Sequence, residues 1–192
     1  MGYKLVAIFD DTPELKSPFE DVELFLGWNG FKKWKQNKHL NEYNFCISIG
    51  NPHGKVRLQI ANLLKNEGLS PLTLIHPSAI IDETVIIGEG SQIMAGSVIQ
   101  ARAKIGNYCI INTKASVDHE VVLGNSCEIG PGSTLCGNIT LKDNVWIGSG
   151  STILPRLTIG ENTIIGASSL LTKSANKNSV YYGVPAKFIK KI

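Results

Sequence analysis

The sequence predicts a mainly β protein in which a parallel β-helix follows a small α/β region. An aliphatic residue recurs at every sixth position from Ile75 to Leu171, 17 times without a miss. Four residues after these positions the side chain is small or aliphatic, as at Ala79, Ser97 and Cys109. A period of six fits neither an α-helix nor an alternating strand, and it is typical of a β-helix built from hexapeptides. We expect both positions to point into the core.

The repeat also predicts how the coils stack. With three strands per coil, residues eighteen apart lie one strand spacing apart along the axis, roughly 4.8 Å. Glycines follow many of the inward aliphatic residues, as at Gly106 and Gly124, and provide the permissive backbone that tight corners need. Cys109 and Cys127 are eighteen apart at the inward small position, so we interpret them as core residues rather than as a metal or redox site.

Residues 1–74 have a different pattern. It predicts strands at 3–9, 44–49 and 72–75, with a basic helix near 31–39 and a second helix from Pro52 to a glycine cap at Gly68. The apolar face of the second helix is expected to consist of Val56, Ile60, Leu63 and Leu64.

This order of elements predicts a parallel, Rossmann-like unit, in which small ligands bind at the carboxyl ends of the strands. Asp10, Asp11 and Gly50 fall at such ends, although an Asp-Asp pair after a strand is also a common turn. We therefore divide the chain into a Rossmann-like α/β domain at 1–74 and a β-helix domain with a C-terminal tail at 75–192.

The composition indicates a folded chain with no preference for nucleic acid. Hydrophobic residues make up 43% and charged residues 18%, and 19 Lys and Arg against 16 Asp and Glu leave a net charge of +3. The sequence has no apolar run of the length that a membrane span needs and no signal-peptide pattern, so we expect a cytoplasmic protein without membrane insertion. The four cysteines form no CxxC pair, which favours reduced thiols.

Motifs along nearly the whole chain resemble those of the sialic-acid O-acetyltransferase and nucleotide-aminosugar N-acetyltransferase family. They are Phe9-Asp10-Asp11, Ile49-Gly50-Asn51, Ile75-His76-Pro77-Ser78-Ala79, Asn112-Thr113, Asp118-His119-Glu120, Gly130-Pro131-Gly132, Cys136-Gly137-Asn138, Trp146-Ile147-Gly148 and Gly183-Val184-Pro185-Ala186-Lys187. The resemblance implies a left-handed β-helix, a homotrimer, and acetyl-CoA bound between neighbouring prisms. It also implies acetylation of the amino group of a nucleotide-linked aminosugar for surface-glycan synthesis, with O-acetylation of a sugar or sialic acid as an alternative.

The sequence departs from the family in two places. The family's first strand and its glycine-rich diphosphate loop have no counterpart, so we expect either a start codon placed too late or a weakened nucleotide site. Glu128 stands where relatives have a histidine that touches the cofactor, which puts cofactor affinity and acyl choice in question.

His119 is the candidate general base for acyl transfer. Histidine accepts a proton near neutral pH, and the repeat points this side chain outward, beside the small residues Ala101 and Gly137. Asp118 or Glu120 would orient the imidazole, and the resemblance favours Glu120. The resemblance further assigns Glu128, Gly137, Ser149 and Ala167 to cofactor binding.

The same residues have other interpretations. His119 as an idle surface residue and Gly137, Ser149 and Ala167 as ordinary corner residues are the alternatives to a catalytic site. A β-helix scaffold that has lost catalysis is a second class, which the intact Asp118-His119-Glu120 motif disfavours. A zinc enzyme would need three histidine ligands, but only His119 lies well within the repeat, so we expect no metal site. The sequence does not specify the sugar, the position or the acyl chain.

Overall fold

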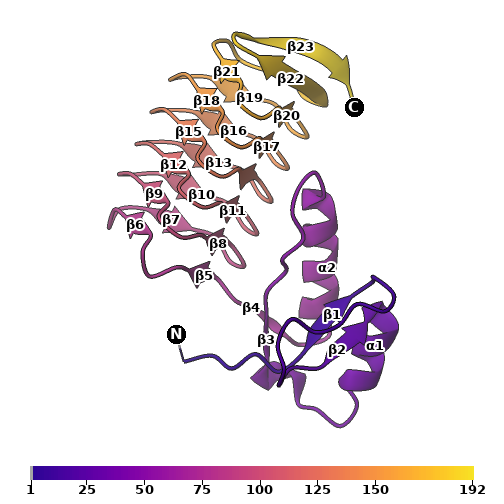
Figure 1. The fold of residues 1–192 in the computed structure, drawn as a ribbon. Coiled ribbons are helices and arrows are strands. Elements are labelled where there is room, and N and C mark those ends of the chain that lie inside the picture. Colours follow the sequence, from indigo (N-terminus) through magenta and orange to yellow (C-terminus); the bar gives the residue numbers. More distant parts are fainter. Residues whose placement is uncertain (1) are drawn as a thin grey trace. The chain divides into compact units, whose positions relative to one another are not determined.

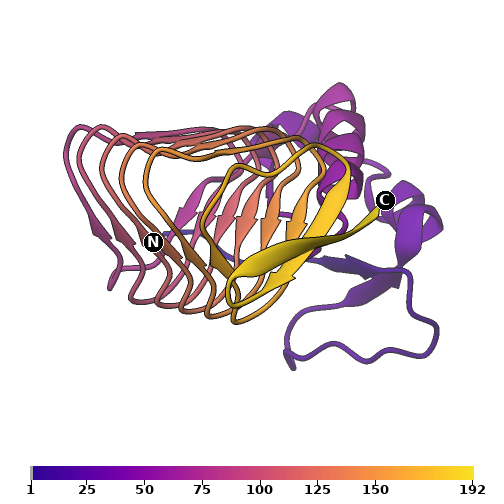
Figure 2. The same ribbon diagram turned by 90° about the horizontal axis from the view of Figure 1, so that it is seen from above.

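The computed structural model describes residues 2–192, which form two compact units. The first unit ends at Tyr43, and the second spans Asn44–Ile192. Most of the second unit is the predicted parallel β-helix, whose successive coils lie one above the other in Figures 1 and 2.

Within residues 2–192 the β-helix strands form three sheets, one on each face of the prism, and we name each face after its first strand. The β7 face contains β7 (Ile86–Ile87), β10 (Lys104–Ile105), β13 (Val122–Leu123), β16 (Thr140–Leu141) and β19 (Thr158–Ile159). The β6 face contains β6 (Ile80–Ile81), β9 (Val98–Ile99), β12 (Ser116–Val117), β15 (Thr134–Leu135), β18 (Thr152–Ile153) and β21 (Leu170–Leu171). The β5 face contains β5 (Leu74–Ile75), β8 (Gln92–Ile93), β11 (Ile110–Ile111), β14 (Glu128–Ile129), β17 (Trp146–Ile147), β20 (Ile164–Ile165), β22 (Ser179–Gly183) and β23 (Ala186–Lys191).

The register confirms the eighteen-residue stacking. On the β5 face, for example, Glu128 pairs with Trp146 and Ile129 with Ile147. Only the closing hairpin, β22 with β23, is antiparallel within this sheet.

The core confirms the predicted phase of the repeat. From Ile93 to Leu171 the residue at every sixth position is buried. Ile75, Ile81 and Ile87 are only partly buried, because the first coil has a neighbouring coil on one side only.

Cys109 and Cys127 are core residues, as predicted. Both are fully buried, and their thiols donate to the backbone carbonyls of Gly124 and Lys142, each at 3.1 Å. Burial raises the pKa of the Cys127 thiol well above its usual value, so this thiol stays protonated.

Segment 44–71 consists of β3 (Asn44–Phe45), α2 (Gly54–Asn66) and β4 (Ser70–Pro71), with β3 and β4 paired in parallel. Gly68 has a φ of +99°, which confirms the predicted glycine cap of the helix.

The predicted buried face of α2 is wrong in part. Val56 and Leu63 are 38% and 49% exposed, whereas Gly54, Arg57 and Ala61 are buried. The helix packs through its small residues: a Cβ added to Gly54 would come within 2.6 Å of the Ser126 carbonyl oxygen. This close approach turns the larger apolar side chains away from the β-helix.

The unit that ends at Tyr43 contains β1 (Ile8–Asp10), β2 (Leu24–Leu26), α1 (Gly27–Trp34) and the short 3₁₀-helix η1 (Leu40–Glu42). The strands β1 and β2 pair in parallel, and aromatic rings bind them to α1: Phe9 lies 5.6 Å from Phe25 and 5.5 Å from Phe31 between ring centroids. The strand expected at 3–9 is thus shorter, and the helix expected near 31–39 lies earlier.

The parallel pairs that the α/β pattern predicts are present, but β1–β2 and β3–β4 belong to separate two-stranded sheets. The structure also groups segment 44–71 with the β-helix, whereas the sequence pattern placed it with the N-terminal domain. Within residues 2–192, no helix is both long and apolar enough to cross a bilayer.

The core predicts the effect of a buried charge at Ile129, which is fully buried. We expect Ile129→Asp to abolish the folded protein, because an unpaired charge inside a close-packed prism costs several kcal/mol. Val122→Asp is the matched control, since Val122 is 39% exposed on the β7 face. Thermal unfolding monitored by circular dichroism measures both, and an unchanged transition in Ile129→Asp would show that the inward positions are misassigned.

Candidate active site

The corner between β12 and β13 carries the predicted catalytic motif. His119 and Glu120 follow β12, and Nδ1 of His119 lies 3.2 Å from Oε2 of Glu120. Because a carboxylate accepts hydrogen bonds, this contact holds the Nδ1 proton and leaves the Nε2 lone pair available as a base. The His119 side chain is 56% exposed, so a substrate has access to it.

Asp118 and Arg102 fix the two sides of this motif. The backbone N–H of His119 donates to Oδ1 of Asp118 at 2.7 Å, so Asp118 holds the backbone while Glu120 faces the ring. Oε1 of Glu120 lies 3.7 Å from Nη1 of Arg102, an exposed ion pair that restrains Glu120 weakly. Of the two candidates for orienting the imidazole, the geometry favours Glu120.

Gly137 provides the space that the imidazole occupies. It stacks one coil above His119, and a Cβ added to Gly137 would collide with Nε2 and Cε1 of the ring. Any other residue at 137 would displace the imidazole.

A pocket of about 460 Å³ opens at this corner. The pocket is the space above Gly137. His119, Gly137 and Pro155 are spaced eighteen residues apart and stack along the axis, and Glu120, Asn138 and Arg156 stack beside them in the same way. Its lining consists of Asp118, His119, Glu120, Cys136, Gly137, Asn138, Pro155 and Arg156. Burial and the Asp118 charge raise the pKa of the Cys136 thiol, so Cys136 is a neutral wall of this pocket.

Ser149 and Ala167, two of the predicted cofactor residues, lie at a different corner. They follow β17 and β20 on the β5 face, and both are exposed. Their backbone N–H groups make no hydrogen bond with any other part of residues 2–192, and neither does the N–H of Gly137. The N–H groups of Ser149 and Ala167 are thus free to donate to a ligand, whereas Gly137 is itself buried beside the His119 ring.

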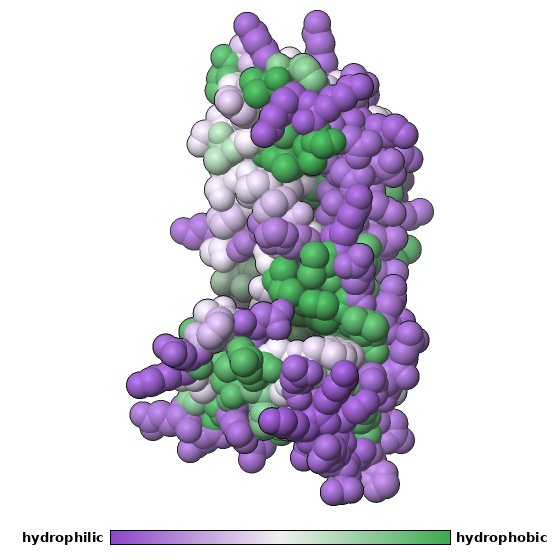
Figure 3. All heavy atoms as spheres, turned by 90° about the vertical axis from the view of Figure 1, so that its right-hand side faces the viewer, coloured by the Kyte–Doolittle hydropathy of each residue, from purple (hydrophilic) through white to green (hydrophobic). Residues whose placement is uncertain are grey.

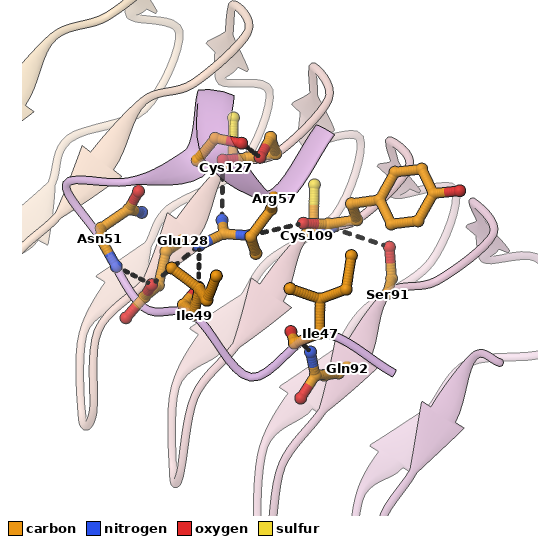
Figure 4. Close-up of polar contacts among 12 residues, drawn as sticks. Ile47, Ile49, Asn51, Arg57, Ser91, Gln92, Cys109, Cys127 and Glu128 are labelled. Carbon is orange, nitrogen blue, oxygen red and sulfur yellow. Dashed lines mark hydrogen bonds and ion pairs between the residues drawn. The ribbon is translucent and has the colours of Figure 1, made fainter. Parts of the chain in front are cut away.

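The predicted residues Glu128 and Gly50 lie together on the β5 face. Oε2 of Glu128 accepts the backbone N–H of Asn51 at 2.9 Å and would be 3.9 Å from a Cβ on Gly50 (Figure 4). The same oxygen lies 3.6 Å from Nη1 of Arg57. Glu128 is therefore enclosed by the segment that precedes α2, and its side chain is only 11% exposed.

Arg57, the centre of this network, is not among the residues that the sequence predicts for the site. Arg57 is 1% exposed and donates to the carbonyl oxygens of Ile49 (2.7 Å), Ser126 (2.9 Å) and Tyr108 (3.3 Å). Burial lowers the pKa of Arg57, and the Glu128 charge opposes that effect. The sequence could have indicated it, because Arg57 lies on the same helical face as Gly54 and Ala61, the small residues through which α2 packs.

Asp10 and Asp11 follow β1, as predicted, in the unit that ends at Tyr43. Hydrogen bonds from the hydroxyl and the backbone N–H of Thr12 lower the pKa of Asp10. The Asp11 carboxylate lies against Gly27, the first residue of α1. Whether these carboxylates and Gly50 form one substrate site stays a prediction, because they belong to different units.

The described part of the chain contains no cluster of metal-ligating side chains. Among residues 2–192, no group of three or more His, Cys, Asp and Glu side chains is placed to hold a metal ion.

The repeat and the fold define the class of protein. The bacterial transferase hexapeptide repeat (six repeats) matches residues 84–119 and 138–173. The chain therefore contains the hexapeptide repeat of bacterial transferases, and its fold is a left-handed parallel β-helix.

Several known proteins are similar to this chain. UDP-N-acetylbacillosamine N-acetyltransferase of Bacillus subtilis (strain 168) is 38% identical over 101 residues, which are 48% of this chain and 40% of that protein. The crystal structure of PerB from Caulobacter crescentus in complex with CoA and GDP-perosamine has a TM-score of 0.85 at 28% identity, covering 97% of this chain and 98% of that one. The acetyltransferase domain of PglB from Neisseria gonorrhoeae FA1090 in complex with acetyl coenzyme A has a TM-score of 0.86 at 25% identity, covering 97% and 87%.

The Gly137 contact predicts an effect of a single methyl group. Gly137→Ala is expected to displace the imidazole and to lower turnover about as much as His119→Ala. Although Gly137 is buried, the nearest atoms to the added methyl group belong to the exposed His119 ring, which can move, so we expect little change in thermal stability. In the His119→Ala background the same change should cost nothing further, because its only target is gone. A second, independent loss in the double variant, measured as kcat, would contradict this reading.

The buried guanidinium predicts a large effect on stability. Arg57→Met is expected to lower the free energy of unfolding by about 3–5 kcal/mol, because it leaves the buried Glu128 charge without its cation and three carbonyl oxygens without their donor. Lys55→Met, an exposed change on the same helix, is the control. Urea unfolding compares the two, and equal midpoints would contradict the assigned role of Arg57.

Proposed function

We propose that the protein is an acetyl-CoA-dependent N-acetyltransferase that acts on the amino group of a nucleotide-linked aminosugar in surface-glycan synthesis. The observation that carries this proposal is the His119–Glu120 pair, with its free Nε2 at a pocket that Gly137 keeps open. The similar proteins support the substrate class, since PerB was crystallised with CoA and GDP-perosamine.

In the proposed reaction the acceptor amine attacks the carbonyl carbon of the thioester. The new C–N bond forms, the amine proton passes to Nε2 of His119, and the C–S bond breaks as the thiol of CoA leaves with that proton. Glu120 stabilises the imidazolium that forms in between. The unpaired N–H of Gly137 is a donor for the oxyanion.

Glu120 and His119 are catalytic residues in this proposal, Gly137, Ser149 and Ala167 bind acetyl-CoA, and Asp10, Asp11 and Gly50 bind the nucleotide sugar. Because Gly137 lies at one corner and Ser149 and Ala167 at another, a donor that touches both sets needs two neighbouring prisms. A homotrimer meets this requirement, and exposed apolar residues such as Ile80 (67%) and Val184 (72%) offer surface for it. Figure 3 shows apolar areas among the hydrophilic residues on one side of the molecule.

A homotrimer would have three times the mass of the 20.8 kDa chain, which light scattering measures directly.

We also assign the protein to the cytoplasm, because its four cysteines are all free thiols.

Substitution of the base tests the proposed reaction. His119→Ala is expected to lower kcat by about 10²–10⁴-fold, since general-base catalysis contributes that much, while acetyl-CoA binding is retained. Glu120→Gln should cost less, because the base remains and only its partner loses charge. The assay follows CoA release with a panel of nucleotide-linked aminosugars. Near-native turnover by His119→Ala would refute the assignment, and a larger loss in Asp118→Asn than in Glu120→Gln would transfer the orienting role to Asp118.

A further inference from the structure

The β-helix holds the Gly50–Asn51 turn through one carboxylate. Glu128 accepts the backbone N–H of Asn51 at 2.9 Å and lies 3.6 Å from Arg57. Arg57 in turn donates to the Ile49 carbonyl oxygen at 2.7 Å, so the pair fixes the turn on both sides of Gly50 (Figure 4).

The turn has few bonds of its own. Its backbone contact from the His53 N–H to the Gly50 carbonyl oxygen is long, at 3.3 Å. The side-chain amide of Asn51 has both polar atoms buried with no hydrogen-bond partner among residues 2–192. Since unpaired buried polar groups destabilise a conformation, the turn depends on Glu128 and Arg57 for its shape.

Glu128 is poorly placed to meet acetyl-CoA directly. It projects from the β5 face under the segment that precedes α2, and its side chain is 11% exposed. His119 lies at the corner between the β6 and β7 faces of the same prism. Ser149 and Ala167, the proposed donor-binding residues that follow strands of the same face as Glu128, are exposed, whereas Glu128 is covered, so its carboxylate serves the turn.

We propose that Glu128 is a positioning residue for the acceptor: with Arg57 it holds the Gly50–Asn51 turn in the shape that binds the nucleotide sugar, and it makes no contact with the acyl donor. This inference rests on the proposed function and replaces the cofactor role that the family resemblance gave Glu128.

Gln92 is a matched control for Glu128. It occupies the same outward column of the β5 face two coils earlier, is equally buried, and donates to the Ile47 carbonyl oxygen at 2.7 Å. Gln92→Ala therefore removes a contact that holds the same segment at Ile47, before the Gly50–Asn51 turn. It is expected to lower the melting temperature while both KM values stay unchanged.

Steady-state kinetics with each substrate varied in turn test the proposal. Glu128→Gln is expected to raise the KM for the nucleotide-linked aminosugar about fivefold or more, because a neutral amide binds the Arg57 charge less well. The KM for acetyl-CoA and kcat should stay within about twofold. Glu128→Asp, which keeps the charge but withdraws it from the Asn51 N–H, should raise the same KM, and it provides a second variant if Glu128→Gln folds poorly.

The possible outcomes distinguish a wrong role for Glu128 from a wrong proposed function. A higher KM for acetyl-CoA with an unchanged acceptor KM would place Glu128 in the donor site and overturn the inference. An equal rise in acceptor KM for Gln92→Ala would attribute the effect to general loosening and overturn it as well. No transfer by the unaltered chain to any nucleotide-linked aminosugar would overturn the proposed function itself, and this inference with it.

Discussion

The stacking of eighteen-residue coils is the constraint on which the rest of the structure depends. Each corner is bonded to the corner one coil away, as the Asn138 N–H is to the His119 carbonyl oxygen at 2.9 Å. A side chain at one corner therefore has a defined neighbour in the next coil, and a glycine in a column creates a space of defined position. The pocket beside His119 follows from this rule, because Gly137 is the next member of its column.

The same repeat produces faces with different environments. Outward residues on the β7 face, such as Ile86 and Val122, are exposed, whereas Gln92, Ile110 and Glu128 on the β5 face are buried. The cause is segment 44–71, which covers part of the β5 face within the same compact unit. Polar groups under that cover need partners, and Arg57 alone donates three hydrogen bonds there.

Periodic and local features could be predicted from the sequence. The inward phase of the repeat and the glycine cap at Gly68 each depend on residues close in sequence or on the regular period. For His119 the local sequence left Asp118 and Glu120 as equal partners, and only the family resemblance favoured Glu120. The Arg57–Glu128 contact joins residues 71 positions apart, and no periodicity connects them. The buried face of α2 was assigned by hydrophobicity, but close packing through Gly54 and Ala61 decided it instead.

In the proposed enzyme, backbone hydrogen bonds hold the catalytic corner, whereas side-chain contacts hold the Gly50–Asn51 turn. The catalytic corner is formed by repeats whose backbone bonds continue through the whole prism, so its geometry tolerates little change. The Gly50–Asn51 turn lies outside the repeat and is attached by side chains, chiefly Glu128 and Arg57. Substitutions in the turn or in its two anchors can alter which acceptor fits without moving His119, because the coils between them keep their register. In the proposed enzyme we therefore expect acceptor choice to change without loss of the chemistry of acetyl transfer.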